Sequence, residues 1–273
     1  MKTVSKKYLK EFVHACKKTA SYGLIKCSSG NLSKKIDKDH MLITPTRIWL
    51  SDIKPSDIVI IRISDGCVIN GAPRTYVRGT FQPAFALRAS GEVRPAQNPP
   101  LRHLDEAEDI LVHSSPDLHP GSSAQADKKK PSAETDLHLG IYRTRKDINT
   151  ILHFQTSYAT ALSCSKNIRK DFFVIPEIPY YIGQVAVIPY KDPGSKQLAK
   201  EVAKAIKNHD MVVMKNHGEV TCGKSFDDVI QKAVFFELAC KIIIKNGKSV
   251  QSIPLKGVKH LLNAGAEEKT GYI

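Results

Sequence analysis

Hydrophobic residues recur at helical spacing in several long stretches of the chain. These stretches are residues 5–21, a segment that begins at Glu134, residues 195–207 and residues 225–244. In each of them, apolar side chains three or four positions apart would share one face of a helix, as Leu9, Phe12 and Cys16 do in the first. Ser225 is suited to cap the last of these helices. A further short helix of small residues is predicted over 158–164.

Short apolar runs rich in β-branched residues lie between these helices and predict the strands of a sheet. They occupy residues 41–44, 58–63, 67–69, 148–152, 185–188 and 211–214. The turn Ser64-Asp65-Gly66 joins the second and third runs into a hairpin. This alternation indicates a mixed α and β fold, and 273 residues with 41% hydrophobic content suffice for one domain with a full core. The basic tail from Asn246 to Ile273 is expected to be loosely held.

The segment from 73 to 127 differs from the rest of the chain in composition. It contains none of the 31 lysines but five of the ten arginines and seven of the fifteen prolines. Five arginines and seven acidic residues give it a charge of −2, while the other 218 residues carry +16. Its one weak helical pattern runs from Leu101 to Val112. We interpret the segment as a flexible insertion in a single domain that spans 1–273, because such long loops are either functional or disordered.

Two of the predicted strands end in polar residues that are typical of metal ligands. The run 148–152 continues into His153 and Gln155, whose side chains face the same side of a strand because they are two positions apart. The run 211–214 continues into His217, and Glu134 begins a predicted helix. Three nitrogen or oxygen donors with a nearby carboxylate indicate a catalytic metal site in which one coordination position stays open for substrate.

Several short motifs follow one another in a fixed order along the chain. They are Ser29-Gly30-Asn31-Leu32-Ser33, Ile43-Thr44-Pro45-Thr46, Pro131-Ser132-x-Glu134-x-x-x-His138, Pro176-Glu177, Pro189-Tyr190, Asp192-Pro193-Gly194 and Asn216-His217-Gly218. Each is weak alone, but in this order the chain resembles the class II aldolase/adducin family outside the insertion. The resemblance implies a three-layer α/β fold of the α+β type, with a central, mainly antiparallel sheet flanked by helices. It also implies a homotetramer with C4 symmetry whose sites lie at subunit interfaces.

The resemblance further implies roles for residues outside the metal site. Asn31, Thr46 and Ser132 would bind the phosphate of a sugar phosphate. Arg47 stands where many members have glycine, and it would either add a bidentate contact to that anion or crowd the pocket. Tyr180 matches a tyrosine that reaches into a neighbouring subunit's site and donates a proton.

From these residues we expect a metal-dependent aldolase-type lyase. The metal would polarise the carbonyl group of a ketose 1-phosphate while Glu134 removes or returns a proton at carbon. Retro-aldol cleavage of a deoxy-sugar phosphate to dihydroxyacetone phosphate and an aldehyde is the first interpretation. Two alternatives stay open. One is a sugar-phosphate 4-epimerase or dehydratase on the same scaffold, and the other is a non-catalytic adducin-like member, which Gln155, Ala133 and the insertion would favour.

Gln155 also bears on which metal is bound. The resembled family usually has histidine there, in an H-x-H motif. We expect Zn²⁺ held by His153, Gln155 and His217, with Mn²⁺ or Mg²⁺ as alternatives because an amide oxygen suits harder cations. His138 lies one helical turn after Glu134 on the same face, where it would either support the site or be an ordinary core histidine.

The net charge of +14 first suggests a nucleic-acid partner. The lysines are dispersed, however, few aromatic residues lie among them, and no nucleic-acid-binding motif is present. We therefore expect no nucleic-acid partner, and the charge would instead attract anionic sugar phosphates. No apolar run approaches the length of a membrane span, so we also expect a cytoplasmic protein with no membrane partner.

Overall fold

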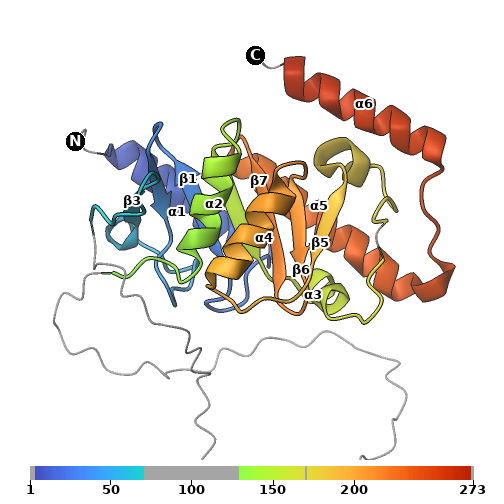
Figure 1. Cartoon of the computed structure of the whole chain (residues 1–273), viewed down its shortest axis with the longest axis horizontal. Helices are drawn as coiled ribbons and strands as arrows, with labels where there is room; N and C mark the ends of the chain where they lie inside the picture. The colour runs from blue at the N-terminus through green and yellow to red at the C-terminus, as the bar shows by residue number, and fades with distance from the viewer. Residues whose placement is uncertain (1–3, 71–128, 170, 272–273) are drawn as a thin grey trace, which may run out of the picture. The chain divides into compact units, whose positions relative to one another are not determined.

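The computed structural model describes residues 4–70, 129–169 and 171–271 (Figure 1). The residues described on either side of the insertion belong to one unit. The 73–127 segment lies outside the described residues, together with its expected helix at Leu101 to Val112. The interpretation of that segment as a flexible insertion in a single domain therefore stays a prediction.

A seven-stranded sheet forms the centre of the described fold. Its strands are β1 (Asn31–Lys35), β2 (His40–Ile43), β3 (Val59–Arg62), β4 (Thr150–Phe154), β5 (Val185–Ile188), β6 (Met211–Met214) and β7 (Gly218–Gly223). Their order across the sheet is β3-β2-β1-β4-β7-β6-β5. All neighbouring pairs are antiparallel except β5 and β6, which are parallel. The predicted mainly antiparallel sheet is thus confirmed.

Helices cover both faces of this sheet and give the three expected layers (Figure 1). One face packs against α2 (Thr135–Thr144) and α4 (Lys196–Ile206). The other packs against α1 (Lys6–Ser21), α3 (Ser157–Ser163) and α5 (Phe226–Asn246). Each face of the sheet buries its own apolar core. The central strands are therefore continuously hydrophobic in sequence, because side chains on both of their faces are buried.

The alternation of side chains along β4 decides which face carries the site. Ile151 belongs to the core under α2 and α4, whereas Leu152 and Phe154 belong to the core under α5. His153 is in register with Val220 of β7, which also faces α2 and α4. Because successive residues of a strand point to opposite faces, His153 is directed toward the α2 side of the sheet.

Three elements correct the expectations from sequence. The predicted strand 67–69 forms an isolated bridge between Val68 and Ile61 instead of a strand. Strand β7 (Gly218–Gly223) was not predicted, although all six of its residues are buried. The tail was expected to be loosely held, but residues Leu255–Gly271 form the helix α6. This helix contacts the short π-helix η2 (Ile178–Ile182) so closely that a Cβ atom at Gly265 would overlap the carbonyl oxygen of Tyr180. Packing on η2 therefore orders the tail.

A buried lysine fixes the end of the sheet that lies away from His217. The ammonium of Lys232 on α5 is 3.1 Å from Asp210 Oδ2, 3.0 Å from Asp228 Oδ1 and 3.0 Å from the carbonyl oxygen of Cys222. These three acceptors match the three N–H donors of an ammonium group. The charge is fully satisfied, which is typical of a structural network.

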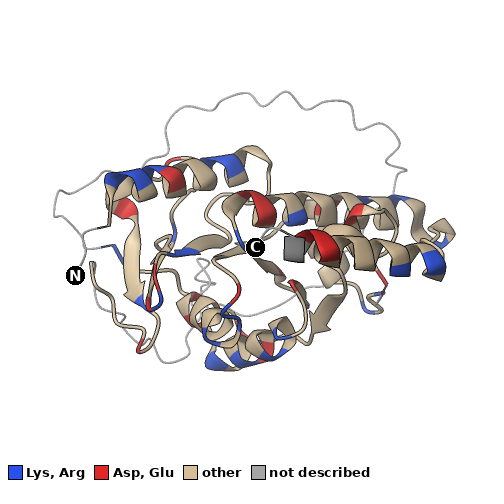
Figure 2. Ribbon diagram, turned by 90° about the horizontal axis from the view of Figure 1, so that it is seen from above, with Lys and Arg blue, Asp and Glu red and all other residues tan. Residues whose placement is uncertain are grey.

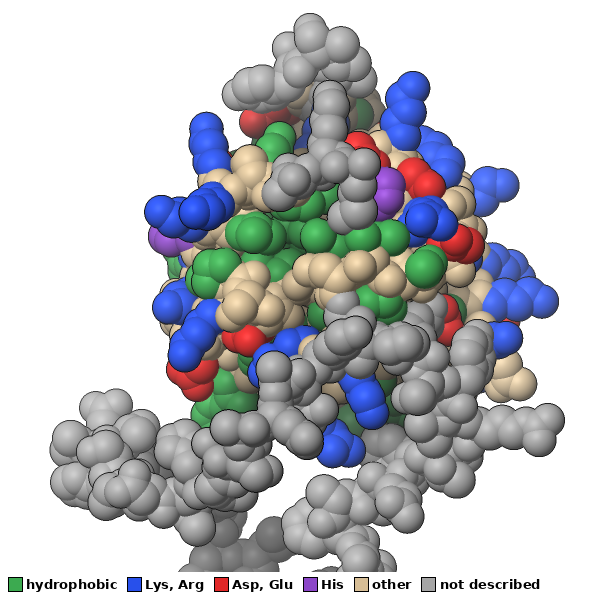
Figure 3. Space-filling model, turned by 90° about the vertical axis from the view of Figure 1, so that its left-hand side faces the viewer, with side chains coloured by type: hydrophobic (Ala, Val, Ile, Leu, Met, Phe, Trp, Pro, Cys, Tyr) green, Lys and Arg blue, Asp and Glu red, His purple; other side chains and the backbone are tan. Residues whose placement is uncertain are grey.

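Basic side chains are distributed over several elements of the described fold, as Figure 2 shows. On the side seen in Figure 3, apolar side chains form a band bordered by Lys and Arg, so the charge is not gathered into one continuous surface there. The expected absence of a nucleic-acid partner stays a prediction. Among the described residues, no helix combines the length and apolar character that crossing a bilayer requires.

Candidate metal centre

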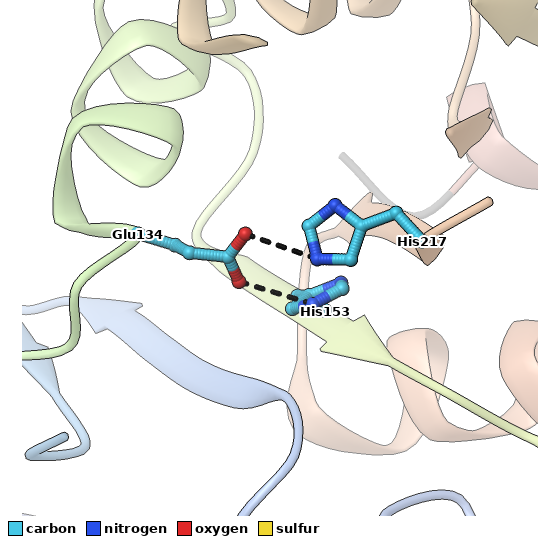
Figure 4. A group of neighbouring side chains, drawn as sticks. All are labelled: Glu134, His153 and His217. Carbon is cyan, nitrogen blue, oxygen red and sulfur yellow. Dashed lines mark ion pairs between the residues drawn. The ribbon is translucent and has the colours of Figure 1, made fainter. Parts of the chain in front are cut away.

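Glu134, His153 and His217 converge from three separate segments (Figure 4). Glu134 immediately precedes α2, His153 lies near the end of β4, and His217 lies in the turn between β6 and β7. His153 Nε2 is 3.0 Å from Glu134 Oε2, and His217 Nε2 is 3.3 Å from Glu134 Oε1. The exposed fractions of the three side chains are 1% for His153, 7% for His217 and 9% for Glu134. The carboxylate therefore faces both imidazoles in a site that is shielded from water.

The pairing of β1 with β4 positions His153. Asn31 lies directly opposite His153 in this antiparallel ladder, so both side chains leave the same face of the sheet. Gly30 makes this close approach sterically possible, because a Cβ atom at position 30 would lie 2.6 Å from the carbonyl oxygen of His153. Gly30 also has φ +76°, a left-handed conformation that glycine adopts without strain.

The turn that carries His217 depends on its two neighbours. Asn216 has φ +56°, a left-handed conformation that asparagine tolerates better than most residues, and its N–H donates to the carbonyl oxygen of Ser163. A Cβ atom at Gly218 would lie 2.7 Å from Gln155 Cγ and 2.8 Å from the carbonyl oxygen of Phe154. The Asn-His-Gly sequence thus has a local structural reason.

Glu134 occupies the N-cap position of α2 without capping the helix through its side chain. Ser, Thr, Asp or Asn would stabilise that position better, typically by about 1 kcal/mol relative to alanine. The carboxylate instead turns toward the histidines and accepts a hydrogen bond of 3.0 Å from Asn31 Nδ2. The backbone N–H of Glu134 donates to Ser132 Oγ at 3.2 Å. The residue at this position therefore contributes contacts to the site and does not stabilise the end of the helix.

The three groups shift one another's pKa values in the metal-free protein. Burial acts to raise the pKa of Glu134, but the charges of His153 and His217 and the hydrogen bonds from His153 and Asn31 hold it well below the ordinary value of 4.5. Burial acts to lower the pKa of His153, but Glu134 raises it above the ordinary value of 6.5. Burial and His153 lower the pKa of His217 to about 4. Glu134 is therefore ionised at neutral pH.

The donor atoms fit a divalent metal ion. One oxygen of Glu134 and one nitrogen of each histidine all lie within 4.8 Å of one another. His153 Nδ1 donates to the carbonyl oxygen of Glu219 at 2.8 Å, which leaves its Nε2 lone pair free for a metal. Glu134 Oε1 is buried without a hydrogen-bond partner among the described residues. Two imidazoles and one glutamate form a known ligand set for catalytic zinc.

Comparison with known proteins assigns this chain to a family. Residues 10–244 match the family described as "Class II Aldolase and Adducin N-terminal domain". The chain belongs to the class II aldolase and adducin family. This membership confirms the resemblance inferred from the ordered motifs and agrees with the mixed fold and its mainly antiparallel sheet.

Individual members of the class II aldolase and adducin family differ in how much of this chain they match. The L-fuculose phosphate aldolase of Methanocaldococcus jannaschii is 27% identical over 87% of this chain and 96% of its own length. The 3-oxo-tetronate 4-phosphate decarboxylase of Escherichia coli K12 is 31% identical over 42% of this chain and 55% of its own length. The solved structure of an L-fuculose 1-phosphate aldolase has a TM-score of 0.66 at 24% identity and covers 95% of this chain and 96% of its own. This structural likeness shows the shared fold.

Gln155, expected from the sequence as a third ligand beside His153 and His217, contacts the centre in a different way. Its Nε2 donates to the carbonyl oxygen of His217 at 2.9 Å. Glu134 is the residue whose oxygens lie next to both imidazole nitrogens. Coordination by Gln155 stays a prediction, while its contact with His217 already supports the turn.

The expected phosphate-binding residues lie along two segments that meet. A bridge between Pro45 and Pro131 places Thr46 near Ser132, and the N–H of Thr46 donates to the carbonyl oxygen of Lys130 at 3.0 Å. Arg47 is exposed and has φ +58°, a left-handed conformation that glycine adopts more readily than other residues. Asn31 differs from the other expected phosphate-binding residues, because its side chain contacts Glu134 and His138. Phosphate binding by these residues stays a prediction.

Tyr180, the expected proton donor, lies away from the metal centre of its own chain. It belongs to η2, which precedes the start of β5, whereas His217 follows the end of the parallel strand β6. The two residues are thus at opposite ends of the sheet. The ring of Tyr180 packs on Tyr181 with centroids 4.8 Å apart. Action of Tyr180 in the site of a neighbouring subunit stays a prediction.

Sequence reasoning missed the residues that surround Glu134 on the α2 side. Ser33 and Tyr142 contact each other near His138, and all three are buried. A signal was present: Glu134, His138 and Tyr142 are four positions apart along a helix, and Asn31 and Ser33 are two apart along a strand. What the sequence does not contain is the register that brings this helix face and this strand face together.

The stabilisation of the protein by a bound metal is expected to grow as the pH rises. The pKa of His153 is raised, so its pairing with Glu134 stabilises the metal-free fold fully below pH 6.5 and loses this effect as the pH passes through the raised value. A metal replaces the proton on that nitrogen. The increase in Tm caused by Zn²⁺ should therefore be larger at about pH 8 than at about pH 5.5. Calorimetry with and without Zn²⁺ measures the increase in Tm at each pH. If the increase in Tm became smaller as the pH rose, binding of the metal at His153 would be contradicted.

Proposed function

We propose that this protein is a metal-dependent lyase that acts on a phosphorylated sugar and cleaves the carbon–carbon bond between the α and β carbons, counted from the carbonyl group. The observation that carries the proposal is the buried convergence of Glu134, His153 and His217 in a chain of the class II aldolase and adducin family. Its fold and site are those that such chemistry needs, with a shielded cation position beside an ionised carboxylate.

The residues of the site divide the chemical work. His153 and His217 would hold a divalent ion, which when bound polarises a substrate carbonyl and stabilises negative charge developing on oxygen. Glu134 is ionised at neutral pH and therefore begins the cycle as a proton acceptor. In aldol cleavage it would accept the proton of the hydroxyl group on the carbon that becomes the aldehyde. After the carbon–carbon bond breaks, Glu134 would give a proton to the carbon that keeps the electron pair. The low exposure of all three side chains excludes water from this step.

Binding of the substrate phosphate would fall to Thr46, Arg47 and Ser132. The guanidinium of Arg47 is accessible and can form a bidentate contact with a phosphate. Asn31 is less suited to this role than the sequence implied, because both ends of its amide already contact protein side chains.

Aldol cleavage of a ketose 1-phosphate is the first candidate reaction, because the match to the L-fuculose phosphate aldolase extends over most of both chains. Decarboxylation of a phosphorylated 3-oxo sugar acid is the second, because the match to the 3-oxo-tetronate 4-phosphate decarboxylase is higher in identity over a shorter region. Both reactions break the bond between the α and β carbons of a carbonyl compound and leave an enolate, whose negative charge lies on the carbonyl oxygen.

Turnover of the two substrate types distinguishes these candidates. The Zn²⁺- and Mn²⁺-loaded protein would be incubated with L-fuculose 1-phosphate, with dihydroxyacetone phosphate as the product measured, and with 3-oxo-tetronate 4-phosphate, with carbon dioxide measured. A matched reaction with the chelated protein gives the background. Metal-dependent formation of either product supports a lyase. Epimerised or dehydrated sugar would favour the alternative on the same scaffold, and binding of metal without any turnover would favour a non-catalytic member.

Assembly into a homotetramer belongs to the same proposal. Tyr180 can act at a Glu134 centre only if another subunit presents it there, because within one chain the two lie at opposite ends of the sheet. Sedimentation equilibrium is expected to give four chains per particle. Zinc as the resident metal and the cytoplasm as the location are likewise proposals.

A further inference from the structure

A continuous line of hydrogen bonds connects the interior of α2 to Glu134. Tyr142 Oη is 3.0 Å from Ser33 Oγ, and Ser33 Oγ is 2.6 Å from His138 Nδ1. His138 Nε2 contacts Asn31 Oδ1, and Asn31 Nδ2 is 3.0 Å from Glu134 Oε2. Asn31, Ser33, His138 and Tyr142 are at most 4% exposed, so water does not compete for these bonds.

The charge on Glu134 sets the direction of the bonds that Asn31, His138 and Ser33 donate. A carboxylate only accepts, so Asn31 must present its NH₂ group to Glu134 and its oxygen to His138. The imidazole then carries its proton on Nε2 and accepts at Nδ1 from the hydroxyl of Ser33. These three donors point toward Glu134, an arrangement in which neighbouring hydrogen bonds strengthen one another. The hydroxyl of Tyr142 lies outside this order, because it donates to the carbonyl oxygen of Asn149 at 3.2 Å.

His138 is suited to hold this order because its two ring nitrogens face different partners, Nε2 toward Asn31 Oδ1 and Nδ1 toward Ser33 Oγ. A neutral imidazole offers one donor and one acceptor on opposite sides of the ring, which is what Asn31 and Ser33 require. The amide of Asn31 does not pass protons along the line. The line therefore orients Glu134 and does not supply it with protons.

We propose that His138 is a positioning residue, which acts through Asn31 to fix the Glu134 carboxylate in the orientation that faces His153 and His217. This inference rests on the proposed metal-dependent function. Without the bond from His138, Asn31 can turn its oxygen toward Glu134, and the carboxylate then leaves the position in which its two oxygens face the two imidazoles.

The affinity for Co²⁺ in folded variants tests this role. His138→Leu removes the donor to Asn31 and is expected to weaken Co²⁺ binding by about tenfold or more, as loss of a residue that orients a metal ligand commonly does. His138→Gln keeps an N–H near the position of Nε2 and should bind within about threefold of the wild type. His14→Leu makes the same chemical change at an exposed position of α1 and is the matched control, with affinity unchanged within error.

The outcomes separate this inference from the function on which it rests. Wild-type protein that binds no Co²⁺ overturns both. Wild-type binding that is unchanged in folded His138→Leu overturns the inference alone, because a merely structural histidine would lower Tm without weakening the metal. If His138→Leu does not fold, Ser33→Ala replaces it, with an expected loss of Co²⁺ affinity of about threefold or more. An unchanged affinity in folded Ser33→Ala would likewise overturn the inference alone.

A second readout needs no metal. In ¹⁵N-resolved spectra of the wild-type protein, His138 is expected to show the tautomer protonated at Nε2, and this state should persist in His217→Ala. Protonation at Nδ1 would reverse the direction of the hydrogen bonds and overturn the proposal.

Discussion

Replacing Glu134 by glutamine is expected to lower kcat by about 10²–10⁴-fold, the usual contribution of a general acid–base group. The amide keeps the size of the side chain but cannot accept the substrate proton. It also places an NH₂ group against one of the two partners that now face a carboxylate oxygen, His153 or His217. Steady-state kinetics on the substrate found by the turnover assay measures the effect.

The control for this variant is Glu11→Gln, which makes the same chemical change at an exposed position of α1. Its kcat should equal that of the wild type, and both variants should keep the wild-type circular dichroism spectrum. A folded Glu134→Gln variant that retains more than about a tenth of wild-type kcat would exclude Glu134 as the proton-transferring group.

Gly30→Ala is expected to lower the free energy of unfolding by about 3 kcal/mol and to displace His153. The methyl group would lie 2.6 Å from the carbonyl oxygen of His153 in a left-handed backbone with φ +76°. Gly23→Ala is the matched control, since Gly23 also has a left-handed φ of +67° but the added carbon would contact only Lys26 Nζ, at 3.8 Å. The control should lose only about 1 kcal/mol. Urea unfolding measures both, and equal losses would show that the contact with His153 does not matter.

The helices and most strands could be predicted because their patterns are local. The apolar spacing of residues 195–207 and 225–244 agrees with α4 and α5, and the Ser225 cap accepts from the N–H of Asp228 at 3.1 Å. Strand β7 escaped prediction because Gly218, Glu219 and Gly223 break its apolar pattern, and its pairing with β4 and β6 makes it a strand. Likewise, α6 is held by contact with η2, which lies far from it in the sequence.

The candidate metal centre was also predictable in part, because some of its residues lie in local sequence patterns. His153, His217 and Glu134 stand at the ends of elements whose boundaries the sequence shows, and the structure brings them together. The contact of Asn31 with Glu134 was not predictable, because it depends on the register in which Asn31 lies opposite His153. A one-residue shift of that register would turn the side chain of Asn31 to the other face.

Metal content is the measurement that tests the central claim most directly. Purified wild-type protein, after incubation with Zn²⁺ or Mn²⁺ and removal of the excess, is expected to hold one divalent ion per chain by elemental analysis. His217→Ala should hold none, while His260→Ala, an exposed histidine on α6, should hold the wild-type amount. Absence of metal from the wild-type protein, or equal metal in wild type and His217→Ala, would contradict a metal centre at Glu134, His153 and His217.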